Sequence, residues 1–139
     1  MFPNGMVLTP DGATLIVAET YAARLTAFDV AADGTLSGRR TWADLSGAGI
    51  YPDGICLDAD GAVWVANARQ PSCIRVQAGG EILREERFSQ RCYACALGGA
   101  DRQTLYVMTA PTSAAARAAE APLGLVETAR VPVPGAGLP

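Results

Sequence analysis

Short apolar segments recur along the chain at a nearly constant spacing, and this repeat restricts the possible folds more than any other feature. The segments are β-branched and apolar, as in buried strands, and their equivalent residues Leu15, Val63 and Leu105 lie 48 and 42 residues apart. About four short strands fit into each unit. Four-stranded units repeated every ~40–50 residues are typical of β-propeller blades. We therefore predict an all-β chain of about three four-stranded propeller blades.

Turn signals divide the chain into blades at about 3–45, 50–89 and 91–131. The third blade has no obvious fourth strand. Its Ala-rich segment 112–121 is too short for a stable isolated helix, so we expect a long loop with at most a helical turn. The proline-containing segment 132–139 is expected to be a loose tail. An all-β sandwich of eleven or twelve strands would explain the strand count, but not the motif that opens the first two blades.

That motif is Pro, then Asn or Asp, then Gly. It occurs as Pro3-Asn4-Gly5 and again, 49 residues later, as Pro52-Asp53-Gly54. Pro restricts φ and Gly permits positive φ, so each triplet is expected to form a tight turn that directs its middle side chain. Amide and carboxylate oxygens are hard ligands that suit a divalent cation. Asn4 and Asp53 are therefore candidate metal ligands, although both residue types are also ordinary turn formers.

The composition excludes several classes of function. The chain has no His, so it cannot itself form a Ser-His-Asp or Cys-His catalytic unit or a His-based zinc site. All eleven basic residues are Arg, they are scattered, and the net charge is −3, which argues against nucleic-acid binding. No apolar run reaches the ~18 residues of a membrane span, and the first residues lack the pattern of a signal peptide. We therefore expect a soluble cytoplasmic protein that has no membrane partner.

The chain has four Cys residues, at positions 56, 73, 92 and 95. Cys92 and Cys95 form a C-x-x-C pair, but no second such pair follows, and residues three apart in a strand point to opposite faces. We interpret the four as buried free thiols rather than as a metal or redox centre.

The two motif blocks, residues 3–18 and 52–66, resemble the regucalcin (senescence marker protein) and gluconolactonase family, and the resemblance extends to about residue 130. It implies a six-bladed propeller with one divalent cation (Ca²⁺, Zn²⁺, Mn²⁺ or Mg²⁺) at the mouth of its channel, and hydrolysis of small sugar lactones. By position, it implies that Asn4 is an amide metal ligand. It also implies that Asp53 is a carboxylate ligand and the catalytic group that handles the proton of the attacking water.

The chain departs from the family in length. Family members have about twice as many residues, so the resemblance implies a C-terminal half without the family's Glu ligand and without the Arg and Asn that contact substrate. Two protein ligands are few for a Ca²⁺ ion, which takes about six to eight oxygens. We expect half of a lactonase that missing sequence completes, with a non-catalytic or vestigial binding module as the alternative. A two-fold homodimer would also close a six-bladed ring, because three blades alone leave two blade faces exposed.

Overall fold

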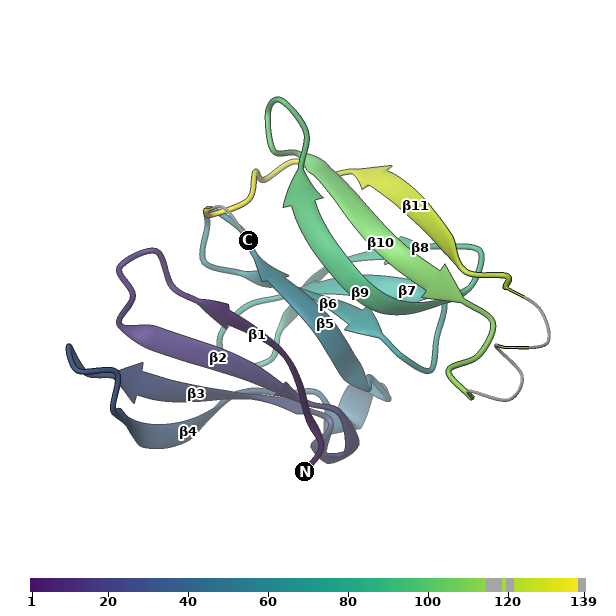
Figure 1. Cartoon of the computed structure of the whole chain (residues 1–139). Coiled ribbons are helices and arrows are strands. Elements are labelled where there is room, and N and C mark those ends of the chain that lie inside the picture. Colours follow the sequence, from purple (N-terminus) through teal and green to yellow (C-terminus); the bar gives the residue numbers. More distant parts are fainter. Residues whose placement is uncertain (115–118, 120–121, 138–139) are drawn as a thin grey trace.

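The computed structural model describes residues 1–114, 119 and 122–137. These residues form three antiparallel sheets, each a simple meander (Figure 1). The first sheet contains β1 (Pro3–Leu8), β2 (Thr14–Glu19), β3 (Arg24–Val30) and β4 (Leu36–Asp44); the second contains β5 (Pro52–Leu57), β6 (Val63–Asn67), β7 (Ser72–Val76) and β8 (Ile82–Arg87). The third contains β9 (Arg91–Gly98), β10 (Thr104–Ala110) and β11 (Leu125–Arg130). Two short 3₁₀ turns, η1 (Thr20–Ala22) and η2 (Ser46–Ala48), complete the described elements.

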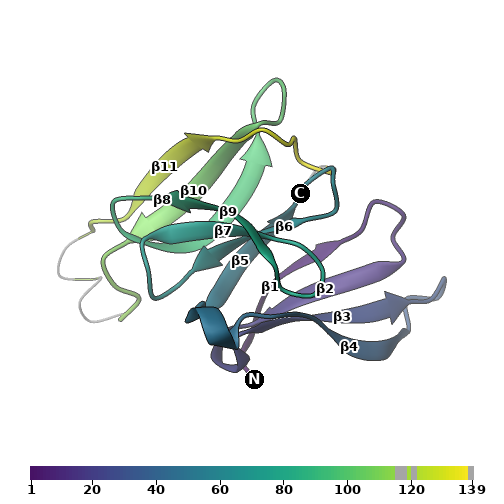
Figure 2. The same cartoon turned by 180° about the vertical axis from the view of Figure 1, so that it is seen from behind.

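The three sheets pack face to face as consecutive propeller blades, as the repeat predicted. Their first strands β1, β5 and β9, which we call the inner strands, lie next to one another in that order, as both views show (Figures 1 and 2). The first two blades have four strands. In the third, three strands lie within the described residues. Most of the Ala-rich segment 112–121 lies outside the described residues.

Burial follows the position of a blade in the stack rather than the residue type. Leu15 of the first blade is partly exposed, whereas Leu105, its counterpart in the third blade, is fully buried. The other face of the same strands shows the reverse, because Ile16 is buried and Tyr106 is 40% exposed. In the middle blade every residue of β6 is buried. Each apolar position is thus buried only where a neighbouring blade covers it.

Two hydrophobic clusters hold the blades together. The first lies between the first and second blades and includes Ile16, Leu25 and Val65. The second lies between the second and third blades and includes Trp64 and Leu105. Burial of large apolar side chains such as these contributes about 1.5–3 kcal/mol each.

The two Pro-Asn/Asp-Gly motifs are not the tight turns that we predicted. Both lie within strands, at a point where the register of β1 against β2 and of β5 against β6 shifts. Neither Gly5 nor Gly54 has a positive φ. A Cβ on Gly5 would lie 2.6 Å from the carbonyl oxygen of Asp53, and one on Gly54 would lie 2.6 Å from Cα of Ala94. Glycine is needed at both positions because the next inner strand approaches so closely.

The C-terminal segment differs from the loose tail that we expected. In residues 132–137, the carbonyl of Pro134 accepts a hydrogen bond from the amide of Ala59 at 2.8 Å. The amide of Ala136 donates to the carbonyl of Leu57 at 3.0 Å, and Gly135 forms a bridge with Asp58. These bonds tie the segment to the second blade, so sequence composition alone misrepresents it. Within the described residues, no helix is long and apolar enough to cross a membrane.

Candidate metal centre

Asn4 and Asp53 occupy the same position in consecutive blades. Each follows a proline that pairs with the last residue of the neighbouring strand, and each lies at the register shift of its inner strand. The close contact of Gly5 with the backbone at Asp53 brings the two strands together at this point. The structure therefore places the two predicted ligands side by side at the start of β1 and β5.

The environment of Asp53 favours a cation. Its carboxyl group is about half buried, and burial raises its pKa above the ordinary value, while the nearby Asn4 amide opposes this shift. No Arg or amino group is among the causes of the shift. A carboxylate that has lost part of its hydration without gaining a counter-charge is stabilised when a cation binds beside it.

Thr20 holds the Asn4 amide. The Thr20 hydroxyl donates a hydrogen bond of 2.7 Å to the carbonyl oxygen of Pro52, and its oxygen accepts one of 3.4 Å from Nδ2 of Asn4. Thr20 is buried at the start of η1. Because its proton is already donated to Pro52, the Thr20 hydroxyl can only accept from Asn4, so the amide nitrogen of Asn4 must face Thr20. Within the described residues, no group donates a hydrogen bond to Oδ1 of Asn4. That oxygen is available as a ligand.

The donor set fits a hard divalent cation, but it is incomplete. One amide oxygen and one carboxylate are the ligand types that Ca²⁺ and Mg²⁺ prefer. Within the residues that the structure describes, no group of three or more His, Cys, Asp or Glu side chains could hold a metal ion. A hard divalent cation held by these two groups would therefore need further oxygen ligands besides the side chains that the structure describes.

Tyr93 is a further candidate residue of the metal centre, and the sequence analysis did not identify it. It follows Cys92, whose pairing with Thr109 precedes a register shift like those in the other two blades. Its side chain therefore takes the position of Asn4 and Asp53 in the third blade. The Tyr93 hydroxyl oxygen is buried and has no hydrogen-bond partner in the described part of the chain. An alignment of β9 with the two motifs would have placed Tyr93 opposite Asn4 and Asp53, and this was the only sign of it in the sequence.

A buried polar residue lies at or next to the end of the second strand of each blade: Glu19, Asn67 and Thr109. Glu19 accepts hydrogen bonds of 2.6 Å from both Arg24 and Thr26, and the bond from Arg24 is the largest cause of its strongly lowered pKa. Oδ1 of Asn67 accepts from two backbone amides of its own loop. These groups are satisfied by the protein itself, so we assign them a structural role.

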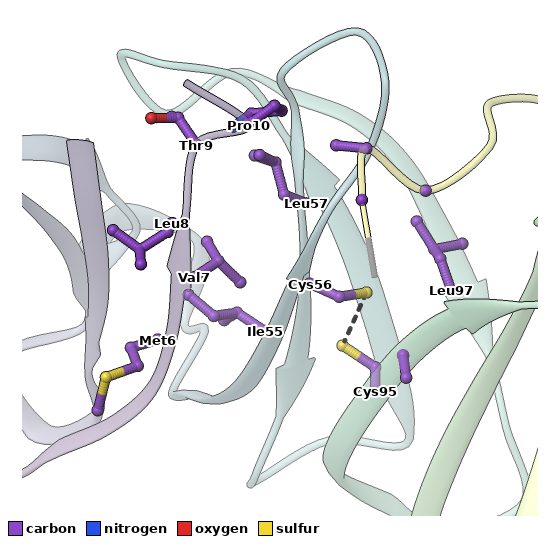
Figure 3. Close-up of a pocket in the computed structure, with 14 residues that line it drawn as sticks. Met6, Val7, Leu8, Thr9, Pro10, Ile55, Cys56, Leu57, Cys95 and Leu97 are labelled. Carbon is purple, nitrogen blue, oxygen red and sulfur yellow. Dashed lines mark hydrogen bonds between the residues drawn. The ribbon is translucent and has the colours of Figure 1, made fainter. Parts of the chain in front are cut away.

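The four thiols are free and lie in or beside the second hydrophobic cluster. Sγ of Cys56 lies 3.7 Å from Sγ of Cys95 (Figure 3). The register shift in β9 lets both Cys92 and Cys95 pack on this cluster, although residues three apart in a regular strand face opposite sides. The hydrogen bond with Cys95 and then burial raise the pKa of the Cys56 thiol, which makes it a poor nucleophile.

A cavity of about 540 Å³ lies beside the later parts of the inner strands (Figure 3). Its walls come from residues 6–10, 55–57 and 95–97, together with residues 135–137 of the C-terminal segment. The labelled side chains are almost all apolar. Neither Asn4 nor Asp53 lines it, so the cavity is separate from the candidate metal centre.

Comparisons with known proteins agree with this architecture. Residues 1–111 match the sequence model of the SMP-30/Gluconolactonase/LRE-like region. The chain is 31% identical to 6-deoxy-6-sulfogluconolactonase of Pseudomonas putida, over 100% of this chain and 49% of the relative. It is 30% identical to regucalcin of Danio rerio, over 77% of this chain and 37% of the relative.

Solved structures show the same relation. A calcium-binding protein, regucalcin, from Agrobacterium tumefaciens superposes with a TM-score of 0.81 at 25% identity. The match covers 99% of this chain and 48% of that protein. The chain therefore spans half or less of the length of these relatives.

Proposed function

Because the chain belongs to the SMP-30/gluconolactonase/LRE-like family, we propose that it forms the cation-binding half of a sugar-lactone hydrolase. The observation that carries the proposal is the pairing of Asn4 with a half-buried Asp53 that has no cationic partner among the residues that the structure describes. Lactonases among the relatives, such as the sulfogluconolactonase and the pentonolactonase of Haloferax volcanii, support a sugar lactone as the substrate class.

Each residue has a defined part in this proposal. A divalent cation (Ca²⁺, Zn²⁺, Mn²⁺ or Mg²⁺) would polarise the lactone carbonyl when bound. Asp53 accepts a proton from the attacking water as the general base. The water oxygen bonds to the carbonyl carbon, the ring C–O bond breaks, and the released alkoxide takes up the proton that Asp53 accepted, which restores the carboxylate. Asn4 supplies Oδ1 as a ligand, in the orientation set by Thr20.

Metal binding is the first test, because it does not require a complete active site. Calorimetric titration with Ca²⁺, Mn²⁺ and Zn²⁺ should detect binding of at least one ion. Asp53→Asn should weaken it by about tenfold or more, since one charged ligand is lost. The matched control is Asp33→Asn, because Asp33 is an exposed turn residue far along the chain from both ligands. Equal affinities for the two variants would refute the assigned ligands.

Hydrolysis of glucono-1,5-lactone, followed with a pH indicator, is the second test. Turnover should require the cation, stop on chelation and fall by about 100-fold or more in Asp53→Asn, the usual range for loss of a general base. A non-catalytic or vestigial propeller module is the second candidate, and the incomplete donor set favours it. Metal binding without turnover in a six-bladed assembly would support the module and contradict the hydrolase.

A further inference from the structure

In the part of the chain that the structure describes, the first and third blades each leave one sheet face uncovered. On the first blade, Met6 is 63% and Leu8 is 55% exposed, and both lie on the side opposite the first hydrophobic cluster. On the third blade, Met108 is 60% and Val126 is 67% exposed, and these two residues pair directly across β10 and β11. Adjacent exposed apolar side chains of this size mark an interaction surface.

These faces are made of the residues that form the core elsewhere in the molecule. By register, Met6 is the counterpart of Ile55, which is buried in the first cluster. Tyr106 is the counterpart of Trp64, which is buried in the second cluster. The two uncovered faces therefore correspond to the two sheet faces that meet at a junction between blades inside the chain. The surface that fits each of them is the face of another propeller blade.

We propose that a second copy of this chain docks on both faces and closes a six-bladed ring around a two-fold axis. A ring closes only when its other half offers one face of the first-blade type and one of the third-blade type. A second copy offers both. The size agrees, since this chain covers 48% of the regucalcin structure and 49% of the sulfogluconolactonase. The proposal names the partner that would complete the candidate site, and its test does not depend on catalysis.

The new junctions differ from the internal ones at one residue. Ala94 stands where the first two blades have glycine, at the point where each inner strand approaches the next. A Cβ at the glycine positions would come within 2.6 Å of the neighbouring backbone. The methyl group of Ala94 therefore makes the distance between β9 and the partner's β1 larger than the distance between β5 and β9 within one chain. This wider spacing lies next to Tyr93 and the metal ligands.

Sedimentation velocity tests the proposal without metal or substrate. At tens of micromolar, the chain should sediment as a folded species of twice its single-chain mass. Met6→Glu and Met108→Glu should each raise the dimer dissociation constant by about 30-fold or more, because each buries an unpaired carboxylate at one of the two faces. The matched control is Ile82→Glu, which also replaces an exposed apolar side chain with a carboxylate, but on β8 of the middle blade. This variant should leave the dimer intact.

The outcomes are distinct. A folded monomer at these concentrations, or a series of larger species, would overturn two-fold closure even if the variants fail to fold. Disruption by only one of the two face variants would also overturn it, since a ring uses both faces. A monomer that associates only with a different polypeptide would rule out the second copy as the partner. A dimer that shows no lactone hydrolysis would refute the proposed function and leave this inference standing.

Discussion

At the scale of single residues, the contact between Thr20 and Asn4 makes the sharpest prediction. Thr20→Val keeps the side-chain shape but removes the hydroxyl that joins the Asn4 amide to the Pro52 carbonyl. We expect the affinity for the cation to fall by about tenfold, the lower end for loss of a group that orients a ligand. Titration calorimetry of the two proteins measures this difference.

The control for this change is Thr20→Ser, which retains the hydroxyl and should keep affinity within about twofold of the wild type. Thr20→Val also leaves buried polar groups without a partner, so its free energy of unfolding should fall by about 1–3 kcal/mol. Metal affinities that are equal in the Val and Ser variants would show that Thr20 serves stability alone.

The sequence predicts Asn4 and Asp53 as candidate ligands because their motifs repeat, and this stays a prediction. It did not reveal Thr20 or Tyr93, for different physical reasons. Thr20 contacts Pro52, 32 residues away in the sequence, and only the packing of two blades creates that contact. Tyr93 shares neither the Pro nor the Gly of the motif, so its equivalence appears only in the strand register.

At the scale of elements, the close approach of the inner strands can be tested with one glycine. Gly54→Ala should lower the free energy of unfolding by about 1–3 kcal/mol, the usual cost of overpacking. Its Cβ would lie 2.6 Å from Cα of Ala94 and 2.9 Å from the carbonyl oxygen of Tyr93, so two backbones must move apart. Urea unfolding of the wild type and the variant measures the loss.

Gly47→Ala is the matched control, because a Cβ at Gly47 meets nothing within 4 Å and its backbone does not need positive φ. It should change the unfolding free energy by no more than about 0.5 kcal/mol. If both variants lose the same amount, glycine flexibility rather than strand approach explains the motif.

Gly5 and Gly54 also show which features of the strands could not be predicted from the sequence. The all-β architecture of blades followed from local apolar patterns and turn residues, which are short-range signals. The role of Gly5 and Gly54 did not, because the clash that excludes a side chain comes from the next blade. The C-terminal segment was misjudged for a related reason, since its hydrogen bonds lie on the distant turn after β5.

At the scale of the whole molecule, the stacking of blades predicts a gradient of stability. The strands β2, β6 and β10 hold equivalent places, and each is hydrogen-bonded to a strand on both sides. They differ in coverage, because among the described residues neighbouring blades cover both faces of β6 but only one face of β2 and β10. Local opening should therefore cost most in β6.

Hydrogen exchange followed by mass spectrometry tests this gradient with an internal control. Under conditions that keep the chain monomeric, amides of β6 should exchange more slowly than those of β2 and β10, by about two orders of magnitude. Raising the protein concentration should then slow exchange in β2 and β10 selectively, because ring closure covers their free faces, while β6 changes little. Equal exchange in the three strands at low concentration would contradict the role of blade stacking. Exchange in β2 and β10 that is independent of concentration would contradict ring closure by a second copy.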